Sequence, residues 1–196
     1  MAPKLYVVCG HPVKASFNSA LATAYADAAQ EVGADVRRTH LADLHYDPIL
    51  HNAYLTVQTL EPDLLKCQED IVWSTKVVLF YPVWWGSVPA LMKGWIDRVF
   101  HPSFAFRYAD KAIFQERLLT GRSGRLVVTM DNPPLWYALR YGSPDKKMMK
   151  AMFMQFCGIS PVEHRAVGSV KLSGHAKRCR WLNEMRALGR RDASRT

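Results

Sequence analysis

A pair of adjacent tryptophans marks the part of the sequence best suited to ligand chemistry. Trp84 and Trp85 stand in an uncharged loop that follows a short apolar run. Aromatic side chains stack on flat rings, and backbone N–H groups of a loop can bond the polar edge of such a ring. The alternative is that both tryptophans only pack in the core. We predict a seat for a planar heteroaromatic ligand, formed by Pro82, Val83, Trp84, Trp85 and Gly86.

A second group of polar residues follows the first apolar run of the chain, Lys4 to Cys9. It contains His11, Ser16, Phe17, Asn18 and Ser19, and it precedes a run with helical spacing. A helix N-terminus carries free N–H groups and favours an anion, so these residues suit a phosphate. The alternative is that Ser16 is only an N-cap. The stretch has neither a G-x-G-x-x-G nor a G-x-x-x-x-G-K-[ST] pattern, so it predicts neither a Rossmann fingerprint nor a P-loop.

A third group closes another apolar run, 125–130. Thr129, Met130, Asp131 and Asn132 come at its end, and two prolines follow them. Two consecutive prolines are expected to stop both strand and helix, so we predict a loop here. Trp136, Tyr137 and Tyr141 follow this loop.

These three groups need a scaffold that brings strand ends together. Five apolar runs predict strands at 4–9, 34–39, 77–81, 125–130 and 162–167, separated by segments with helical periodicity. Such alternation predicts an α/β chain with a five-stranded parallel sheet, covered by helices on both faces. The flavodoxin-like order 2-1-3-4-5 fits the count, and its switch point brings the ends of strands 1 and 3 together, where a flavin binds. We predict a single domain over 1–196, with about 190–196 as a basic tail.

The helices that flank the candidate groups have predictable starts and faces. Ser87 and Ser143 are the expected N-caps of two of them, with Pro89 in the first turn of the first. The segment 41–61 is a long polar connection before a helix over about 61–73. The last helix is expected over about 173–188. The helix after Ser143 should bury one stripe, namely Met148, Met149, Met152, Phe153, Phe156 and Cys157.

Composition limits the class of protein and its compartment. The chain has 196 residues, 49% of them hydrophobic, and a net charge of +9. No apolar run reaches the roughly 18 residues of a membrane-spanning helix, and the start lacks a signal-peptide layout. The four cysteines show neither C-x-x-C nor zinc-finger spacing. We therefore expect free thiols in the cytoplasm, no metal site and no integral membrane segment.

The positive charge gathers near the C-terminus. From Lys171 onward the chain has eight Lys and Arg residues and only two acidic residues, Glu184 and Asp192, which gives this segment a net charge of +6. This is either a solvated helix face or a surface that attracts a phosphorylated cofactor or an acidic partner. No recognition motif accompanies it, so nucleic-acid binding is not expected.

The stretch 80–100 (FYPVWWGSVPALMKGWIDRVF) resembles the flavodoxin-fold NAD(P)H:quinone oxidoreductases, the DT-diaphorase-like family. Its pattern P-x-x-W-x-x-x-P-A-x-x-K-G-W-x-[DE]-R-V-F is close to a signature of that family. The matching residues are Pro82, Trp85, Pro89, Ala90, Lys93, Gly94, Trp95, Asp97, Arg98, Val99 and Phe100. Further matches are His11 with 16–18 (Ser-Phe-Asn), 47–48 (Asp-Pro) and 156–158 (Phe-Cys-Gly).

The resemblance implies a noncovalent flavin, a homodimer, and hydride transfer from NAD(P)H through the flavin to a quinone-like acceptor. His11, Phe17 and Asn18 would hold the phosphate end, 82–85 would line the ring, and 129–132 would contact its polar edge. Trp95 is expected in the core, and Asp97 and Arg98 in structural or dimer contacts. Short relatives that lack the Ser-Phe-Asn triplet and the long second connection look like FMN enzymes, so we expect FAD, with FMN as the alternative.

The chain departs from the family pattern after the fourth strand. Better-known quinone reductases have Thr-Thr-Gly-Gly there, then a Tyr and, six residues later, a His. Here 129–132 reads Thr-Met-Asp-Asn, Tyr137 matches the Tyr, and Ser143 stands in place of the His. Tyr137 is thus the one candidate catalytic residue, without its usual partner.

Two classes of function remain open from the sequence. The first is an enzyme, an NAD(P)H-dependent reductase of quinones or of azo or nitro compounds. The second is an electron carrier or a redox-sensing flavoprotein accessory subunit without significant turnover. Electron-carrying flavodoxins are strongly acidic, so the charge of +9 disfavours the carrier.

Overall fold

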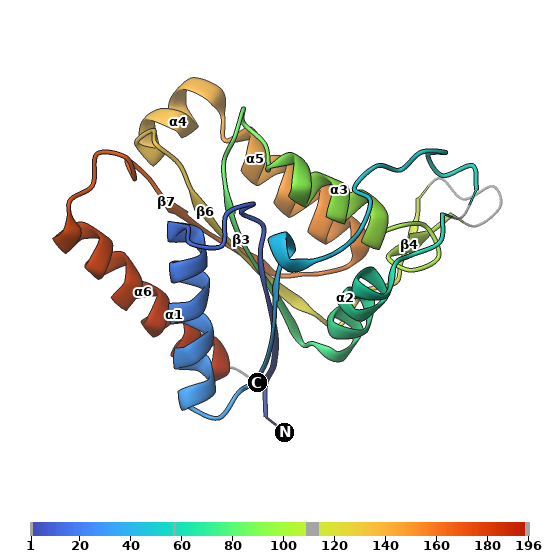
Figure 1. Ribbon diagram of the computed structural model, residues 1–196, viewed down its shortest axis with the longest axis horizontal. Coiled ribbons are helices and arrows are strands. Elements are labelled where there is room, and N and C mark those ends of the chain that lie inside the picture. The colour runs from blue at the N-terminus through green and yellow to red at the C-terminus, as the bar shows by residue number, and fades with distance from the viewer. Residues whose placement is uncertain (1, 57, 109–113, 195–196) are drawn as a thin grey trace.

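Five parallel strands in the order β2-β1-β3-β6-β7 form the central sheet, as expected for the order 2-1-3-4-5 (Figure 1). The computed structural model describes residues 2–56, 58–108 and 114–194. The sheet strands are β1 (Lys4–Cys9), β2 (Asp35–His40), β3 (Lys76–Pro82), β6 (Ser123–Thr129) and β7 (Val162–Val167). The main helices are α1 (Phe17–Glu31), α2 (Pro62–Trp73), α3 (Ala90–Val99), α4 (Pro134–Tyr141) and α6 (His175–Ala193). A helix that begins as α5 (Pro144–Lys146) continues as a π-helix, η2 (Lys147–Gln155).

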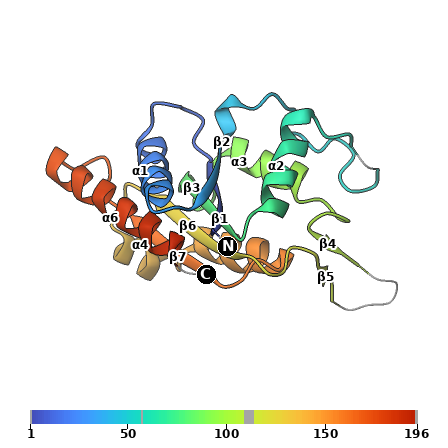
Figure 2. The same ribbon diagram turned by 90° about the horizontal axis from the view of Figure 1, so that it is seen from below.

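Helices cover both faces of the sheet because its central strands are apolar on both sides. On one face Val7, Val78 and Val127 pack with α1 and α6, and on the other Val8, Leu79 and Leu126 pack with α2, α3 and η2. Figure 1 shows α1 and α6 on one side of the sheet and α2, α3 and α5 on the other. Figure 2 shows the short hairpin of β4 (Phe106–Arg107) and β5 (Glu116–Arg117), which the sequence did not indicate, projecting beyond α2 and α3.

The long connection 41–61 is packed against α3, and two residues of the signature explain how. It begins with the 3-10 turn η1 (Leu41–Asp43). Arg98 is buried; it donates to the carbonyl oxygens of Asp47 and Thr59 and to Glu61 Oε2 at 2.8 Å. A Cβ on Gly94 would lie 2.6 Å from the Pro48 carbonyl oxygen, so only glycine allows this approach. Arg98 therefore has the structural role predicted for it.

One predicted helix start differs from the observed one, and a second has the predicted N-cap residue without its expected cap bond. The helix at 87–99 begins at Ala90, with Pro89 rather than Ser87 in the N-cap position. Ser87 cannot cap it because its backbone pairs with Trp84 and its hydroxyl lies against the Met148 sulfur. Ser143 does occupy the N-cap position of α5, but its side chain makes no cap bond. It has a left-handed backbone with φ of 50°.

The segment after β6 also differs from the prediction. The predicted loop ends at Pro133, and Pro134 begins helix α4 instead of stopping it. A proline at the first helical position loses no hydrogen bond, because that N–H has no intrahelical acceptor. The expected buried stripe is also shifted, since Met152 is exposed and Met154 is buried. The i→i+5 bonds of the π-helix change the angle between successive side chains.

The C-terminal basic segment is helical for most of its length. α6 continues to Ala193, so residues 190–193 are its last turn and not a tail. Asp192 is buried there; its Oδ1 accepts from Arg125 Nη2 at 2.7 Å and its Oδ2 from Tyr25 Oη at 2.6 Å. These bonds fasten α6 to α1 and to β6. Residues 195–196 lie outside the described part of the chain.

The described residues contain neither a membrane-spanning helix nor a cluster of metal ligands. None of their helices is long and apolar enough to cross a membrane. No group of three or more His, Cys, Asp or Glu side chains within 2–56, 58–108 and 114–194 is arranged to hold a metal ion.

Candidate functional site

The three predicted groups meet at the carboxyl edge of the sheet. β1 and β3 are joined past their ends by a hydrogen bond from Gly10 N to Phe80 O of 2.7 Å. β3 and β6 are joined by one from Val83 N to Thr129 O of 2.8 Å. The order of the strands therefore brings the loops after β1, β3 and β6 side by side, as expected at a switch point.

The loop after β1 ends in a capped helix N-terminus. Ser16 is the N-cap of α1, and its hydroxyl accepts from Ser19 N at 3.2 Å. The amides of Phe17 and Asn18 belong to the first turn and have no intrahelical acceptor. His11 Nδ1 lies 2.9 Å from Val13 N and 3.2 Å from Val13 O, so the backbone of Val13 holds the ring in place. The loop thus offers backbone N–H donors to an anion, with the imidazole of His11 beside them.

Asn18 connects this loop to the end of β6. Its side chain is buried, and Nδ2 donates to Thr129 Oγ1 at 2.8 Å. Its Oδ1 is buried without a hydrogen-bond partner in the described part of the chain. Buried acceptors are normally satisfied, so an unpaired one at a loop edge fits a ligand that carries a hydroxyl or N–H donor.

The tryptophan loop is a tight two-residue turn. Trp84 N donates to Ser87 O at 3.0 Å and Ser87 N to Trp84 O at 2.9 Å, with Trp85 and Gly86 at the tip. Their φ angles are 53° and 72°, the signs of a type I′ turn. Glycine suits this region and tryptophan does not, so Trp85 is held in a strained backbone.

The two tryptophans have different surroundings. The Trp84 ring meets His11 edge to face, with centroids 5.8 Å apart, so it joins the loops after β1 and β3. The Trp85 side chain is fully exposed. Neither is a core residue, which excludes the alternative that they only pack inside.

The stretch 129–132 is divided between two neighbours. Thr129 is buried next to Asn18. The backbone N–H of Met130 donates a hydrogen bond to Val167 O, and its carbonyl oxygen accepts one from Val170 N. Asp131 Oδ1 accepts from Lys171 N at 2.9 Å, so this side chain is bound to the loop after β7. Asn132 is exposed, and its carbonyl oxygen accepts from Ser169 N at 3.2 Å.

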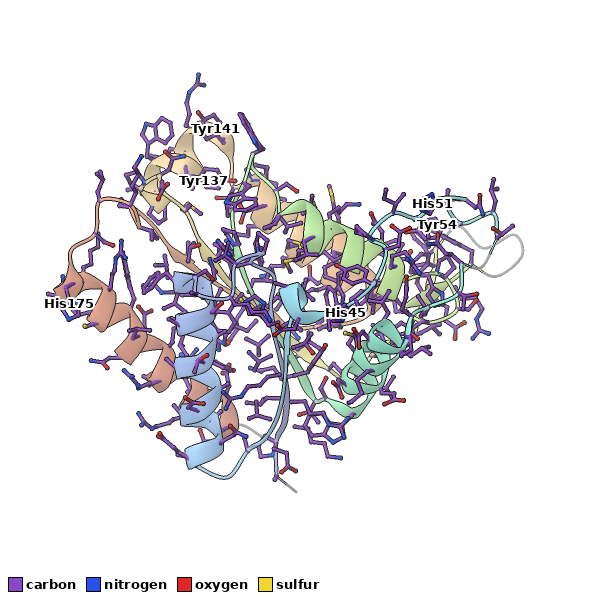
Figure 3. The ribbon with its side chains drawn as sticks, in the orientation of Figure 1. His45, His51, Tyr54, Tyr137, Tyr141 and His175 are labelled. Atoms are coloured by element: carbon purple, nitrogen blue, oxygen red, sulfur yellow. The ribbon has the colours of Figure 1, made fainter. Side chains whose placement is uncertain are left out.

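Tyr137 lies directly behind the tryptophan turn. Its side chain is buried, and a Cβ on Gly86 would be 3.9 Å from its hydroxyl oxygen. Figure 3 shows it at the edge of the site below Tyr141, both on α4. Burial first, and then the nearby Asp145 carboxyl, raises the pKa of Tyr137 above its ordinary value. The phenol therefore keeps its proton at neutral pH and is able to donate a hydrogen bond.

Other nucleophilic groups near the site are not set up for catalysis. Ser19 Oγ and His40 Nε2 are 2.8 Å apart, but His40 Nδ1 accepts from Ala42 N. This tautomer places the proton on Nε2, so His40 donates to the serine and cannot act as its base. Burial raises the pKa of the Cys9 thiol, which disfavours the reactive thiolate.

Part of the basic C-terminal region reaches the phosphate loop. Trp181 packs on Phe17 with ring centroids 6.0 Å apart, and the Arg178 guanidinium lies 5.7 Å from the centre of the Phe17 ring. Arg178 Nε also donates to Ser173 Oγ at 3.1 Å. One charge of this region is thus fixed beside the N-terminus of α1.

The family with a flavodoxin-like fold matches residues 3–187. The chain belongs to this family. It is 25% identical to rat (Rattus norvegicus) NAD(P)H dehydrogenase [quinone] 1, over 84% of this chain and 68% of the rat protein. It therefore spans about two thirds of that relative.

Solved structures support the same fold. An NAD(P)H:quinone oxidoreductase from Methanothermobacter marburgensis superposes with a TM-score of 0.81 at 21% identity, over 97% of this chain and 98% of that one. A Bacillus anthracis FMN-dependent NADH-azoreductase in complex with FMN gives 0.76 at 16% identity, over 98% and 100%. At these identities the likeness establishes the fold alone.

The residues at the edge fit a flavin. The unpaired Asn18 Oδ1 suits a hydroxyl donor of a ribityl chain, and the α1 N-terminus suits a phosphate. The Tyr137 hydroxyl is likewise buried without a partner in the described residues, and it suits the polar edge of a ring. These side chains come from different loops and helices, so one elongated ligand with a phosphate and a polar ring satisfies all of them.

Sequence reasoning missed the polar residues behind Tyr137. Asp145, Tyr81 and His164 have buried side-chain atoms without partners in the described chain. A signal was present, because Asp145 stands one helical turn before Met149 in an otherwise apolar stripe. His164 alternates with Val162 and Ala166 on the same face of β7.

Proposed function

We propose that the protein is a flavin-dependent NAD(P)H oxidoreductase that delivers two electrons to quinones or similar acceptors. The observation that carries this is the convergence of a capped helix N-terminus, the Trp84–Ser87 turn and the buried Tyr137 hydroxyl at one sheet edge. A bound flavin accepts hydride from NAD(P)H and passes it to an acceptor. The chain itself binds, orients and donates hydrogen bonds.

The residues have distinct proposed roles. The amides of α1 together with His11 would hold the phosphate, and Asn18 Oδ1 would accept a hydrogen bond from the part of the ligand that links the phosphate to the ring. The backbone of the Trp84–Ser87 turn would face the ring, and Trp85 would cover it. Tyr137 donates to its polar edge, where negative charge grows during reduction, so a neutral phenol with a raised pKa suits the position.

FAD is proposed over FMN. A groove of about 690 Å³ along α1 begins at Ser16 and Ser19 and is lined further on by Leu182 and Arg186. Its place next to the phosphate loop supports a cofactor that extends beyond one phosphate. The FMN in the Bacillus anthracis azoreductase is the counter-example. Heat release and chromatography of the bound flavin distinguish the two cofactors.

A homodimer and a cytoplasmic location complete the proposal. Leu135 and Leu139 on α4 and Met152 on η2 are exposed apolar side chains at the site end of the molecule. A second copy would cover them, so Leu139→Asp should shift the sedimenting species toward monomer while an exposed-site control, Val72→Asp on α2, should not. All four cysteines are free, which supports a reducing compartment.

The activity is tested by anaerobic reduction. NADH or NADPH should bleach the purified yellow protein. One equivalent of a small benzoquinone, added to the bleached protein, should then restore the colour. Bleaching without reoxidation by any quinone, azo or nitro compound would favour a redox-sensing subunit. A protein that binds neither FAD nor FMN would contradict both functions.

A further inference from the structure

Four titratable side chains from four elements meet behind the Trp84–Ser87 turn. They are Tyr81 of β3, Tyr137 of α4, Asp145 of α5 and His164 of β7. Asp145 is 1% exposed, and Tyr81 is fully buried. We call these four residues the Asp145 cluster.

The Asp145 cluster lacks the hydrogen bonds that buried groups normally make. Both carboxyl oxygens of Asp145, the hydroxyls of Tyr81 and Tyr137, and His164 Nε2 have no partner in the described residues. His164 Nε2 lies 3.9 Å from Asp145 Oδ2. A buried carboxyl without a hydrogen bond is costly, so the basic side chain beside it is the natural partner for its proton or its charge.

Among the ion pairs of the described residues, Asp145 has His164 alone as its partner. Tyr81, Tyr137 and His164 face it from β3, α4 and β7, while Lys146 and Lys147 beside it on its own helix are exposed. β7 places His164 in register with Leu126, on the sheet face that packs on η2. Asp145 Oδ2 and His164 Nε2 therefore lie 3.9 Å apart in a buried pocket, close enough for each group to influence the proton of the other.

The Asp145 cluster also touches the proposed flavin seat. A Cβ on Gly86 would lie 3.1 Å from Pro144 Cγ and 3.9 Å from the Tyr137 hydroxyl. Tyr137 is thus close to the turn, and its hydroxyl is also close enough to Asp145 for that carboxyl to raise the pKa of the phenol. A tyrosine hydroxyl has one hydrogen. Whether Asp145 donates a hydrogen bond to the Tyr137 oxygen or accepts one from it therefore decides where that hydrogen points.

We propose that the Asp145–His164 pair sets the direction of the Tyr137 hydrogen bond toward the cofactor. With its proton, Asp145 donates to the Tyr137 oxygen, and the tyrosine hydrogen points into the site. When the proton passes from the Asp145 oxygen to His164 Nε2, the carboxylate accepts the tyrosine hydrogen, and Tyr137 presents a lone pair to the site instead. No other bond forms or breaks. Asp145 and His164 are positioning residues, and this role rests on the proposed function.

The pair itself is tested without cofactor. In the flavin-free full chain, NMR titration of labelled histidines should show the pKa of His164 at least about one unit lower in Asp145→Asn than in the wild type. Asp97→Asn, which removes an exposed carboxylate paired with Lys93, should leave it unchanged. His175, exposed near the start of α6 and far from Tyr137, is the internal reference (Figure 3). If His164 has the same pKa in the wild type and in Asp145→Asn, or if it does not titrate in either protein, the proposed pairing of Asp145 with His164 is wrong.

The consequence for the reaction is tested on the holoprotein. The amide that Asp145→Asn introduces donates at every pH, so this variant should keep flavin reduction by NAD(P)H and lose one ionisation from its pH profile. Tyr137→Phe should slow flavin reduction about tenfold or more, and His164→Gln should move the same ionisation. A profile of Asp145→Asn identical to the wild type would refute the directing role. If wild-type flavin is not reduced at all, the proposed function fails, while the histidine titration still decides the pair.

Discussion

Replacing Trp85 with glycine should raise the stability of the folded chain and lower its affinity for the flavin. Trp85 combines a fully exposed side chain with a φ of 53°. A left-handed backbone costs a non-glycine residue roughly 1–2 kcal/mol. Glycine removes that strain, but its greater freedom in the unfolded chain offsets roughly 0.5–1 kcal/mol. No packing is lost, so the net gain is about 0.5–1 kcal/mol, a rise in Tm of about 1–4 °C.

The same change removes the side chain that covers the proposed ring. Covering about 100 Å² of apolar surface is worth about 2.5 kcal/mol. The dissociation constant for flavin should therefore rise roughly 70-fold in Trp85→Gly. The assay is fluorescence titration of flavin into apoprotein, beside thermal unfolding of the same sample.

The matched control is Ser103→Gly. Ser103 is also exposed and has a φ of 76°, but it lies after α3, away from the turn. It should become slightly more stable and bind flavin as the wild type does. A Trp85→Gly variant that gains stability and keeps full flavin affinity would refute the placement of this side chain over the ring.

Further predictions concern the loop contacts and the core. Asn18→Asp should weaken flavin binding more than Asn18→Ala, since a second negative charge faces the phosphate end; titration calorimetry compares the two, and equal losses would count against a phosphate there. Arg98→Met should lower the free energy of unfolding by about 3 kcal/mol in urea, because Glu61 and two carbonyl groups of the 41–61 connection lose their donor; a loss below about 1 kcal/mol would show that the connection is held otherwise. Burial alone raises the pKa of Asp192, but hydrogen bonds from Arg125 and Tyr25 outweigh it and hold that pKa below its ordinary value. Its stabilisation is therefore present above about pH 4 and lost as the pH falls through the folded pKa. Asp192→Asn should cost about 3 kcal/mol at pH 7, and the gap to the wild type should narrow in acid, whereas Glu31→Gln, which breaks an exposed pair with Arg190, should change unfolding by less than about 1 kcal/mol.

The fold was predictable because its strands are short apolar runs separated by helical periodicity. The strand 162–167 matches β7 at both ends, and the sheet order follows from the alternation. Helix starts were less predictable where prolines cluster. Pro134 begins α4 and Pro89 delays α3, and both outcomes depend on tertiary contacts that a local pattern does not contain.

The loops of the candidate site were predictable, but the orientation of their side chains was not. A pattern of residues places Trp84, Trp85 and Asp131 in loops at one edge. It does not show that Trp84 contacts His11, that Trp85 is exposed, or that Asp131 is bound to the Lys171 amide. The Asp145 cluster was not predicted for a related reason. A single carboxyl in a Met-rich stripe does not reveal that side chains from β3, α4 and β7 pack around it in the folded chain.

The central claim is that one flavin lies between the α1 N-terminus, the Trp84–Ser87 turn and Tyr137. A crystal structure of the chain reconstituted with its flavin tests this most directly. The account predicts a phosphate at the amides of Phe17 and Asn18, the ring against the turn, and the Tyr137 hydroxyl bonded to the polar edge of the ring. Flavin density elsewhere, for instance in the Met-lined pocket by Phe153 and Phe156, would contradict it.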